Sequence, residues 1–272
     1  LTIGGSGVVQ AGNVVLSKNG AALLASLTLN AGGLLKATKV TSANAFGTTQ
    51  LTFNSGTLVA TGNEPAFMSG ITTAQIDAGG ATIDTQAFGV TMAQPLSGAG
   101  GLTKLGSGTL TMTGAGSYTG TTTVAQGGLV MSTRPTGGGA VTVADGSLLG
   151  VTVAGALNSQ LTLSSLRTGS GSALTIDLAS FGNPTSAPLN VTGGLTTSGA
   201  STVINVSSGA PATGTVPLVS YGSLNTYNFT LGTLPTGMSA SLVNNSAANR
   251  IDLLISNIPI RRWEGNVSAV WD

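Results

Sequence analysis

The residues best suited to catalysis in this chain are a few widely separated carboxylates. Enzymes that cleave polysaccharides use paired carboxylates as acid and base, or carboxylates that bind Ca²⁺ beside a basic partner. Asp77 and Asp84 are the closest early pair, and Asp145 follows alone. Asp77 and Asp145 stand where other copies of the same local pattern carry Asn or Ala. We therefore expect these side chains to cap turns rather than to catalyse a reaction.

The residue types behind most other mechanisms are absent, because the chain has no histidine and no cysteine. This excludes Ser–His and Cys–His nucleophiles and thiolate or imidazole metal ligands. The string Gly79–Asp84 lacks the third glycine of the calcium-binding repeat G-G-x-G-x-D. No helix follows the glycine-rich strings, so they are not phosphate-binding loops. We expect no catalytic site, no cofactor and no metal.

Charge is unusually sparse, at 6% of residues with a formal net charge of +1, while 41% of residues are hydrophobic. Such a chain can build a core, and it has neither the basic stripe that binds nucleic acid nor an apolar run that spans a membrane. We expect Lys36 and Lys104 to point outward and aid solubility. Tyr118, Tyr221 and Tyr227 offer a possible carbohydrate-binding platform, although we favour a role in filling wide corners of the fold.

Short alternating segments such as Thr109–Thr113 and Ala173–Leu178 place apolar side chains on one face and Thr or Ser on the other. Glycine interrupts the chain every few residues, which disfavours helices. This pattern is typical of β-strands, so we expect an all-β protein.

The strands recur with a fixed unit, which reads apolar residue, two residues, glycine, one residue, apolar residue. Its copies start at Val9, Leu29, Phe53, Leu105, Val124 and Val143, with a degraded copy at Ile76. Successive units start at a spacing typical of solenoid repeats. We interpret the longest gap between units as holding an extra strand, Val90–Ala93. A turn at the glycine, flanked by inward apolar residues, predicts a parallel β-solenoid with coils of about 20 residues over 1–180. The expected corner and inward residues are Gly12, Gly32, Gly56, Gly79, Gly108, Gly127, Gly146, Leu110, Val124 and Leu129.

The amino-acid composition changes after residue 180, where prolines and aromatic residues become more frequent. Residues 181–257 are expected to form wider coils or a cap, and Ser239–Ser256 has the pattern of a hairpin. Residues 258–272 carry both tryptophans and read as the start of a following module.

The string GAGGLTKLGSGTLTMTGAGSYTGTTTVAQGGLVM, at Gly98–Met131, resembles the autotransporter-associated β-strand repeat of bacterial surface proteins. Its Gly, Leu, Thr and Val positions are filled, as are Lys104 and Tyr118, whereas Ser117 departs from the usual Asn or Thr. The resemblance implies a right-handed parallel β-helix on an exported, extracellular surface protein. It carries over no catalytic residues.

Three functions follow from these patterns. The preferred one is a non-catalytic stalk, filament or surface-layer module that associates with copies of itself or with neighbouring modules. An adhesin that binds a glycan or a host protein is the alternative, and an enzyme acting on polysaccharide is the least favoured.

Overall fold

The computed structural model describes residues 1–16, 24–43, 47–209 and 212–258. These residues form strands, turns and bends. Within this described part, no helix has the length and apolarity needed to cross a lipid bilayer. The all-β prediction is confirmed. The expected following module at 258–272 lies outside the described residues, apart from residue 258.

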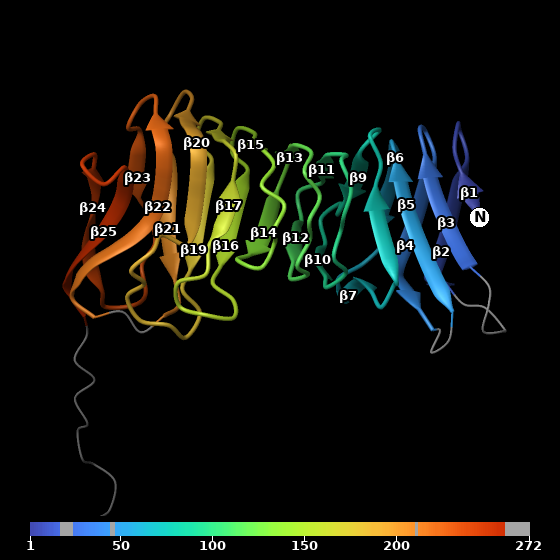
Figure 1. Ribbon diagram of the computed structural model, residues 1–272, viewed down its shortest axis with the longest axis horizontal. Coiled ribbons are helices and arrows are strands. Elements are labelled where there is room, and N and C mark those ends of the chain that lie inside the picture. The colour runs from blue at the N-terminus through green and yellow to red at the C-terminus, as the bar shows by residue number, and fades with distance from the viewer. Residues whose placement is uncertain (17–23, 44–46, 210–211, 259–272) are drawn as a thin grey trace, which may run out of the picture.

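The chain winds through three rows of strands, and each strand lies parallel to its equivalent in the next coil (Figure 1). The first row begins with β1 (Thr2–Ile3), β3 (Leu24–Asn30), β5 (Thr48–Asn54) and β8 (Thr73–Ile76). The second row comprises the first halves of β2 (Val8–Leu16) and β4 (Leu34–Ser42), then β6 (Gly56–Ala60), β9 (Ala81–Asp84), β11 (Leu102–Leu105), β13 (Thr122–Val124), β15 (Val141–Val143), β18 (Leu166–Thr168) and the ends of β20 (Leu189–Thr197) and β22 (Gly214–Leu224).

The third row runs along the remaining side of the coil. It comprises the second halves of β2 and β4, then β7 (Glu64–Ser69), β10 (Gly89–Met92), β12 (Thr109–Met112), β14 (Gly128–Ser132), β16 (Leu148–Thr152), β19 (Ala173–Asp177), β21 (Thr202–Ser207) and β23 (Phe229–Leu231). The strand expected at Val90–Ala93 is β10, and it is not an extra strand. It has an equivalent in the coils on either side, so that interpretation of the longest gap was wrong.

The first row loses regular strands in the middle of the molecule but keeps its backbone hydrogen bonds. Ser97 N donates to Ala74 O and Ser117 N donates to Leu96 O in the coil before. Regular strands return at β17 (Leu161–Leu163), which pairs with the first half of β20. The coils therefore stay bonded on all three sides.

Coil length varies along the chain, and the expected length of about 20 residues describes only the middle. The register pairs Val8 with Leu34 near the start, Leu102 with Thr122 in the middle and Leu166 with Leu195 toward the end, so the middle coil is the shortest of the three. Because the coils on both sides are longer, the lower edge of the molecule is indented around β10, β12 and β14 (Figure 1).

The core is a column of inward side chains, because alternate residues of each strand point inside. Leu110, Val124 and Leu129 are all fully buried, as predicted. Outward residues stack too: the half-buried threonines Thr57, Thr82, Thr103, Thr123 and Thr142 form one ladder along the second row. The sequence pattern thus identified these apolar inward residues of the middle coils.

The pairing direction changes at the C-terminal end. β24 (Ser239–Asn245) and β25 (Arg250–Asn257) form an antiparallel hairpin, and β25 lies antiparallel to β22. This confirms the hairpin expected at Ser239–Ser256.

Candidate functional site

The most distinctive chemical group in the interior is the ammonium of Lys104. In β11 the inward positions are Leu102 and Lys104, with Thr103 facing outward. The register places Lys104 between the inward residues Ile83 and Val124 of the neighbouring coils. The side chain is fully buried. The expectation that Lys104 points outward was wrong, whereas Lys36 is half-buried.

The buried ammonium binds the turn between β11 and β12 to the turn of the next coil. Lys104 Nζ donates to the carbonyl oxygens of Leu105 at 3.0 Å, Gly106 at 2.9 Å, Gly108 at 2.9 Å and Gln126 at 3.1 Å. A charged donor makes stronger hydrogen bonds to carbonyls than a neutral donor does. One side chain therefore closes its own turn and ties that turn to the following coil.

Burial lowers the pKa of Lys104 to about 8 from its ordinary 10.5, and the carboxylate of Asp84 raises it in partial compensation. Asp84 is held nearby in an Asx turn, where its Oδ1 accepts the backbone N–H of Gln86 at 2.8 Å. The ammonium form is thus the costly form at this position, even with four acceptors around it.

This pKa makes stability depend on pH. Between about 8 and 10.5 the unfolded chain holds a proton that the folded chain has released, so the free energy of unfolding should rise with pH across that window. Carbon NMR at Lys104 Cε, with denaturant unfolding at each pH, measures both quantities. A titration midpoint near the ordinary lysine value, or a stability that falls across the window, would contradict the expectation.

The predicted corner glycines fall on two different turns, and one of them lies within a strand. Gly12 lies inside β2, where that strand continues from the second row into the third without a break. Gly56 begins β6 and the neighbouring Ser55 takes the positive φ. Gly32 and Gly79 lie in turns from the first row to the second, and Gly108, Gly127 and Gly146 in turns from the second row to the third. The long gap in the repeat lies between the units at Ile76 and Leu105. There the unit changes from turns between the first and second rows to turns between the second and third rows.

Tyr118 fills a corner of the coil, as favoured from the sequence. Its ring is buried and its hydroxyl lies 2.7 Å from Thr122 Oγ1, inside the coil. Burial raises the pKa of Tyr118, and the Thr122 hydrogen bond opposes this shift. Tyr118 is therefore not available as an exposed glycan contact.

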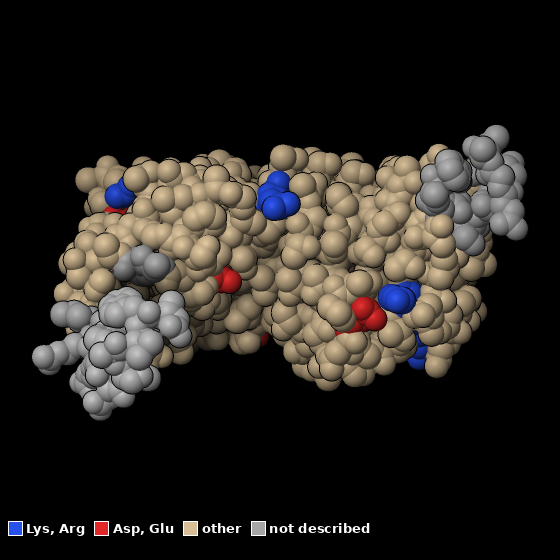
Figure 2. All heavy atoms as spheres, turned by 90° about the horizontal axis from the view of Figure 1, so that it is seen from below, with Lys and Arg blue, Asp and Glu red and all other residues tan. Residues whose placement is uncertain are grey.

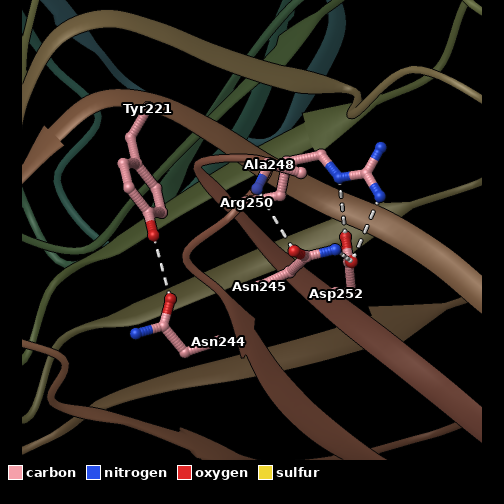
Figure 3. A network of polar contacts seen from close by, with 6 residues as sticks. All are labelled: Tyr221, Asn244, Asn245, Ala248, Arg250 and Asp252. Carbon is pink, nitrogen blue, oxygen red and sulfur yellow. Dashed lines mark hydrogen bonds and ion pairs between the residues drawn. The ribbon is translucent and has the colours of Figure 1, made fainter.

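The side chains of Tyr221 and Tyr227 differ in how deeply they are buried. Tyr221 is buried at the end of β22 and donates to Asn244 Oδ1 at 2.9 Å (Figure 3). Burial raises its pKa, and Asp252 adds to the shift. Tyr227 is 37% exposed and lies edge-on to Phe229, with 5.7 Å between ring centroids. Of the three tyrosines, Tyr227 alone has a substantially exposed side chain.

A polar cluster in the terminal hairpin was missed from the sequence (Figure 3). Asp252 is buried, and its carboxylate accepts Asn245 Nδ2 at 2.9 Å and forms an ion pair with Arg250 Nε at 3.1 Å. Asn245 also accepts the backbone N–H of Ala248, which closes the hairpin turn. The alternation of Arg250 and Asp252 on one strand was the available signal. These contacts hold the hairpin in shape.

The acids proposed for catalysis are held apart. Asp77 accepts Gln75 Nε2 at 2.7 Å near one end of β9, Asp84 caps the turn at the other end, and Asp145 accepts the backbone N–H of Ser170 from the next coil at 2.8 Å. Among the described residues, no three acidic, His or Cys side chains gather as a metal site would require. Asp84 caps its own turn, whereas Asp145 bonds a turn of the next coil and Asp77 bonds a side chain.

The clearest likeness to known proteins falls on the coil that contains Lys104. Residues 102–131 match the family model of the passenger-associated-transport-repeat. This segment is similar to the passenger-associated-transport-repeat. The chain has no significant match among curated proteins or solved structures. The match confirms the resemblance drawn from the Gly98–Met131 string.

The passenger-associated-transport-repeat begins with β11 and ends inside β14, so it covers about one and a half coils. It contains the Lys104 turn, the Tyr118 corner and the inward residues Leu110, Val124 and Leu129. Of the chemically distinctive residues in this segment, Lys104 joins one coil to the next and Tyr118 bonds within its own coil.

Proposed function

We propose that this chain is a non-catalytic structural module, a rigid stalk segment carried outside the cell on an exported bacterial surface protein. The passenger-associated-transport-repeat at 102–131 supports export as a passenger. The polar residues inside that repeat are used in turns and between coils, which supports a structural role. The observation that carries the proposal is the unbroken parallel stacking of coils on both sides of the repeat.

The second row sets the length of the stalk. Ten strands follow one another in it, from β2 to β22. At about 4.8 Å per step this gives roughly 43 Å of rod. Parallel β connections favour a right-handed path, so we propose a right-handed coil whose terminal hairpin closes the stack.

Self-association is part of the proposal, as in a filament or a surface layer. Charged residues are few on the face shown in Figure 2, and most of that face is uncharged. Little charge repulsion therefore opposes side-by-side contact along the threonine ladder. The alternative, an adhesin that binds glycan, is left with Tyr227 as its exposed aromatic, and glycan binding lost in Tyr227→Ala would favour it.

Deletion of one whole coil tests the structural role. Removing residues 103–122 joins Leu102 to Thr123, and because Leu102 pairs with Thr122 the remaining coils meet in register. The deletion removes Lys104 together with three of its four hydrogen-bond acceptors, and it removes Tyr118 together with its partner Thr122. We expect a folded rod that is shorter by about 5 Å, measured by small-angle X-ray scattering.

The matched control removes residues 103–112, which is half a coil. This deletion places third-row residues against second-row residues and should unfold the neighbouring coils. A whole-coil deletion that unfolds as completely as the half-coil deletion would count against a modular, length-setting function.

A further inference from the structure

A groove lies on the outside of the narrow middle coils, where the third row turns back toward the first. It has a volume of about 610 Å³ and crosses four successive coils, from the turn after β10 to the end of β16. We call it the waist groove, and the residues used below are Pro95, Thr111, Val130, Ser132, Arg134 and Thr152. Figure 2 views the side on which these turns lie, and the outline is indented near mid-length.

Differences in coil length produce this hollow. The coils that build the groove are short, since Thr109 pairs with Gly128 and Gly128 pairs in turn with Leu148. The next coil is longer, because Leu148 pairs with Ala173, and its additional residues lie mainly in the longer turn after β16. The longer coil therefore makes a wall at one end of the groove.

The lining combines an apolar floor with a single charge. Val130 and Pro95 contribute apolar surface, and the register places Thr111 beside Val130. Arg134 is exposed at the edge and is the charged residue of the lining, which contains no acid. In the described part of the chain Arg134 makes no ion pair.

A second observation comes from Ser132. The register places Ser132 beside Thr152, and both belong to the outward set of their strands together with Val130. Ser132 is 6% exposed, and among the residues that the structure describes its hydroxyl has no hydrogen-bond partner. A buried polar group without a partner is costly, and a serine hydroxyl reorients by rotation about one bond. A ligand oxygen in the groove would satisfy it.

We propose that the waist groove binds an aliphatic carboxylate, with the carboxylate on Arg134 and Ser132 and the chain running along Val130 toward Pro95. Four coils span about 14 Å, which suits an extended chain. A sugar fits less well, because the lining has no aromatic ring, amide or carboxylate to orient its hydroxyls. Asp177 lies beyond Thr152, and its carboxylate already accepts the Ala179 N–H and the Ser208 hydroxyl. The free cation is therefore at the Arg134 end.

Isothermal titration of the whole chain with decanoate tests this site, with butanoate and decyltrimethylammonium as probes that lack the long chain or the negative charge. We expect decanoate to bind at one site and to shift the NMR signals of the Val130 methyl groups. Butanoate and the cationic probe should bind at least tenfold more weakly.

Variants separate this site from general surface binding. Arg134→Gln should weaken decanoate binding about tenfold and Ser132→Ala about threefold, whereas Arg167→Gln, at an exposed arginine on β18, should leave it unchanged. Equal binding in Arg134→Gln and Arg167→Gln, or no binding of decanoate, would overturn the proposal. The coil deletion above tests the stalk function separately, since a groove without a ligand leaves the rod intact.

Discussion

Replacing Lys104 by methionine is expected to lower the free energy of unfolding by about 2–4 kcal/mol, because buried carbonyls lose their charged donor. Methionine matches the length of the lysine stem, so the packing between Ile83 and Val124 is largely kept. The carbonyls of Leu105 and Gly108 also accept N–H groups from Thr85 and Gly128. The loss should therefore fall mainly on Gly106 and Gln126.

In some proteins, replacing a buried charge by an apolar side chain leaves the free energy of unfolding unchanged, because the desolvation cost of the charge is removed as well. Which of the two costs is larger at Lys104 depends on whether its carbonyl acceptors are left without a donor. Lys104 has no carboxylate in direct contact, and its hydrogen bonds go to turn carbonyls that stay in place when it is removed. Leaving those acceptors without a donor is the larger cost.

Hydrogen exchange is the decisive measurement for Lys104→Met, since coils interact only with their neighbours and damage should stay local. We expect faster exchange at the amides of Gly108 and Gly128, which bridge adjacent coils. Lys36→Met, at a half-buried lysine, is the control and should change stability by less than about 0.5 kcal/mol. Unchanged exchange in Lys104→Met would mean that water replaces the ammonium.

The fold was largely predictable from the sequence, because alternation and the turn glycines act locally. Thr109–Met112 shows its inward Leu110 and outward threonines without any knowledge of neighbours. One short unit describes two turn types, and at Gly12 only the pairing of β2 with β4 shows that a single strand continues from the second row into the third.

The interior polar groups were harder to predict, because they depend on register between coils. Lysine is normally exposed, and the repeat unit suggested Leu105 as the inward residue beside the turn. Counting alternation from Leu102 instead places Lys104 inside, next to Ile83. Lys104 also occupies one of the fixed positions of the repeat that the sequence resembles, which was a further indication of an interior role. The waist groove had no local signal, since it follows from differences in length between coils.

Gly127→Ala is expected to destabilise the molecule by about 2–5 kcal/mol, through backbone strain and a steric clash together. Gly127 has a φ of 65°, which costs a residue with a Cβ atom about 1–2 kcal/mol. A Cβ there would also press against the carbonyl oxygens of Gly106 and Gly108 in the preceding coil, far inside van der Waals contact. Since backbone atoms cannot move aside as a flexible side chain does, the two coils must separate locally.

Gly146→Ala is the matched control, because Gly146 occupies the equivalent turn one coil later with the same φ of 65°. A Cβ at Gly146 meets no atom within 4 Å. Its substitution therefore reports backbone strain alone, about 1–2 kcal/mol. Thermal unfolding of both variants isolates the cost of forcing two coils apart. Equal losses would show that the contact between Gly127 and the preceding turn adds nothing, and that the close approach of the coils at this turn is not what makes glycine necessary there.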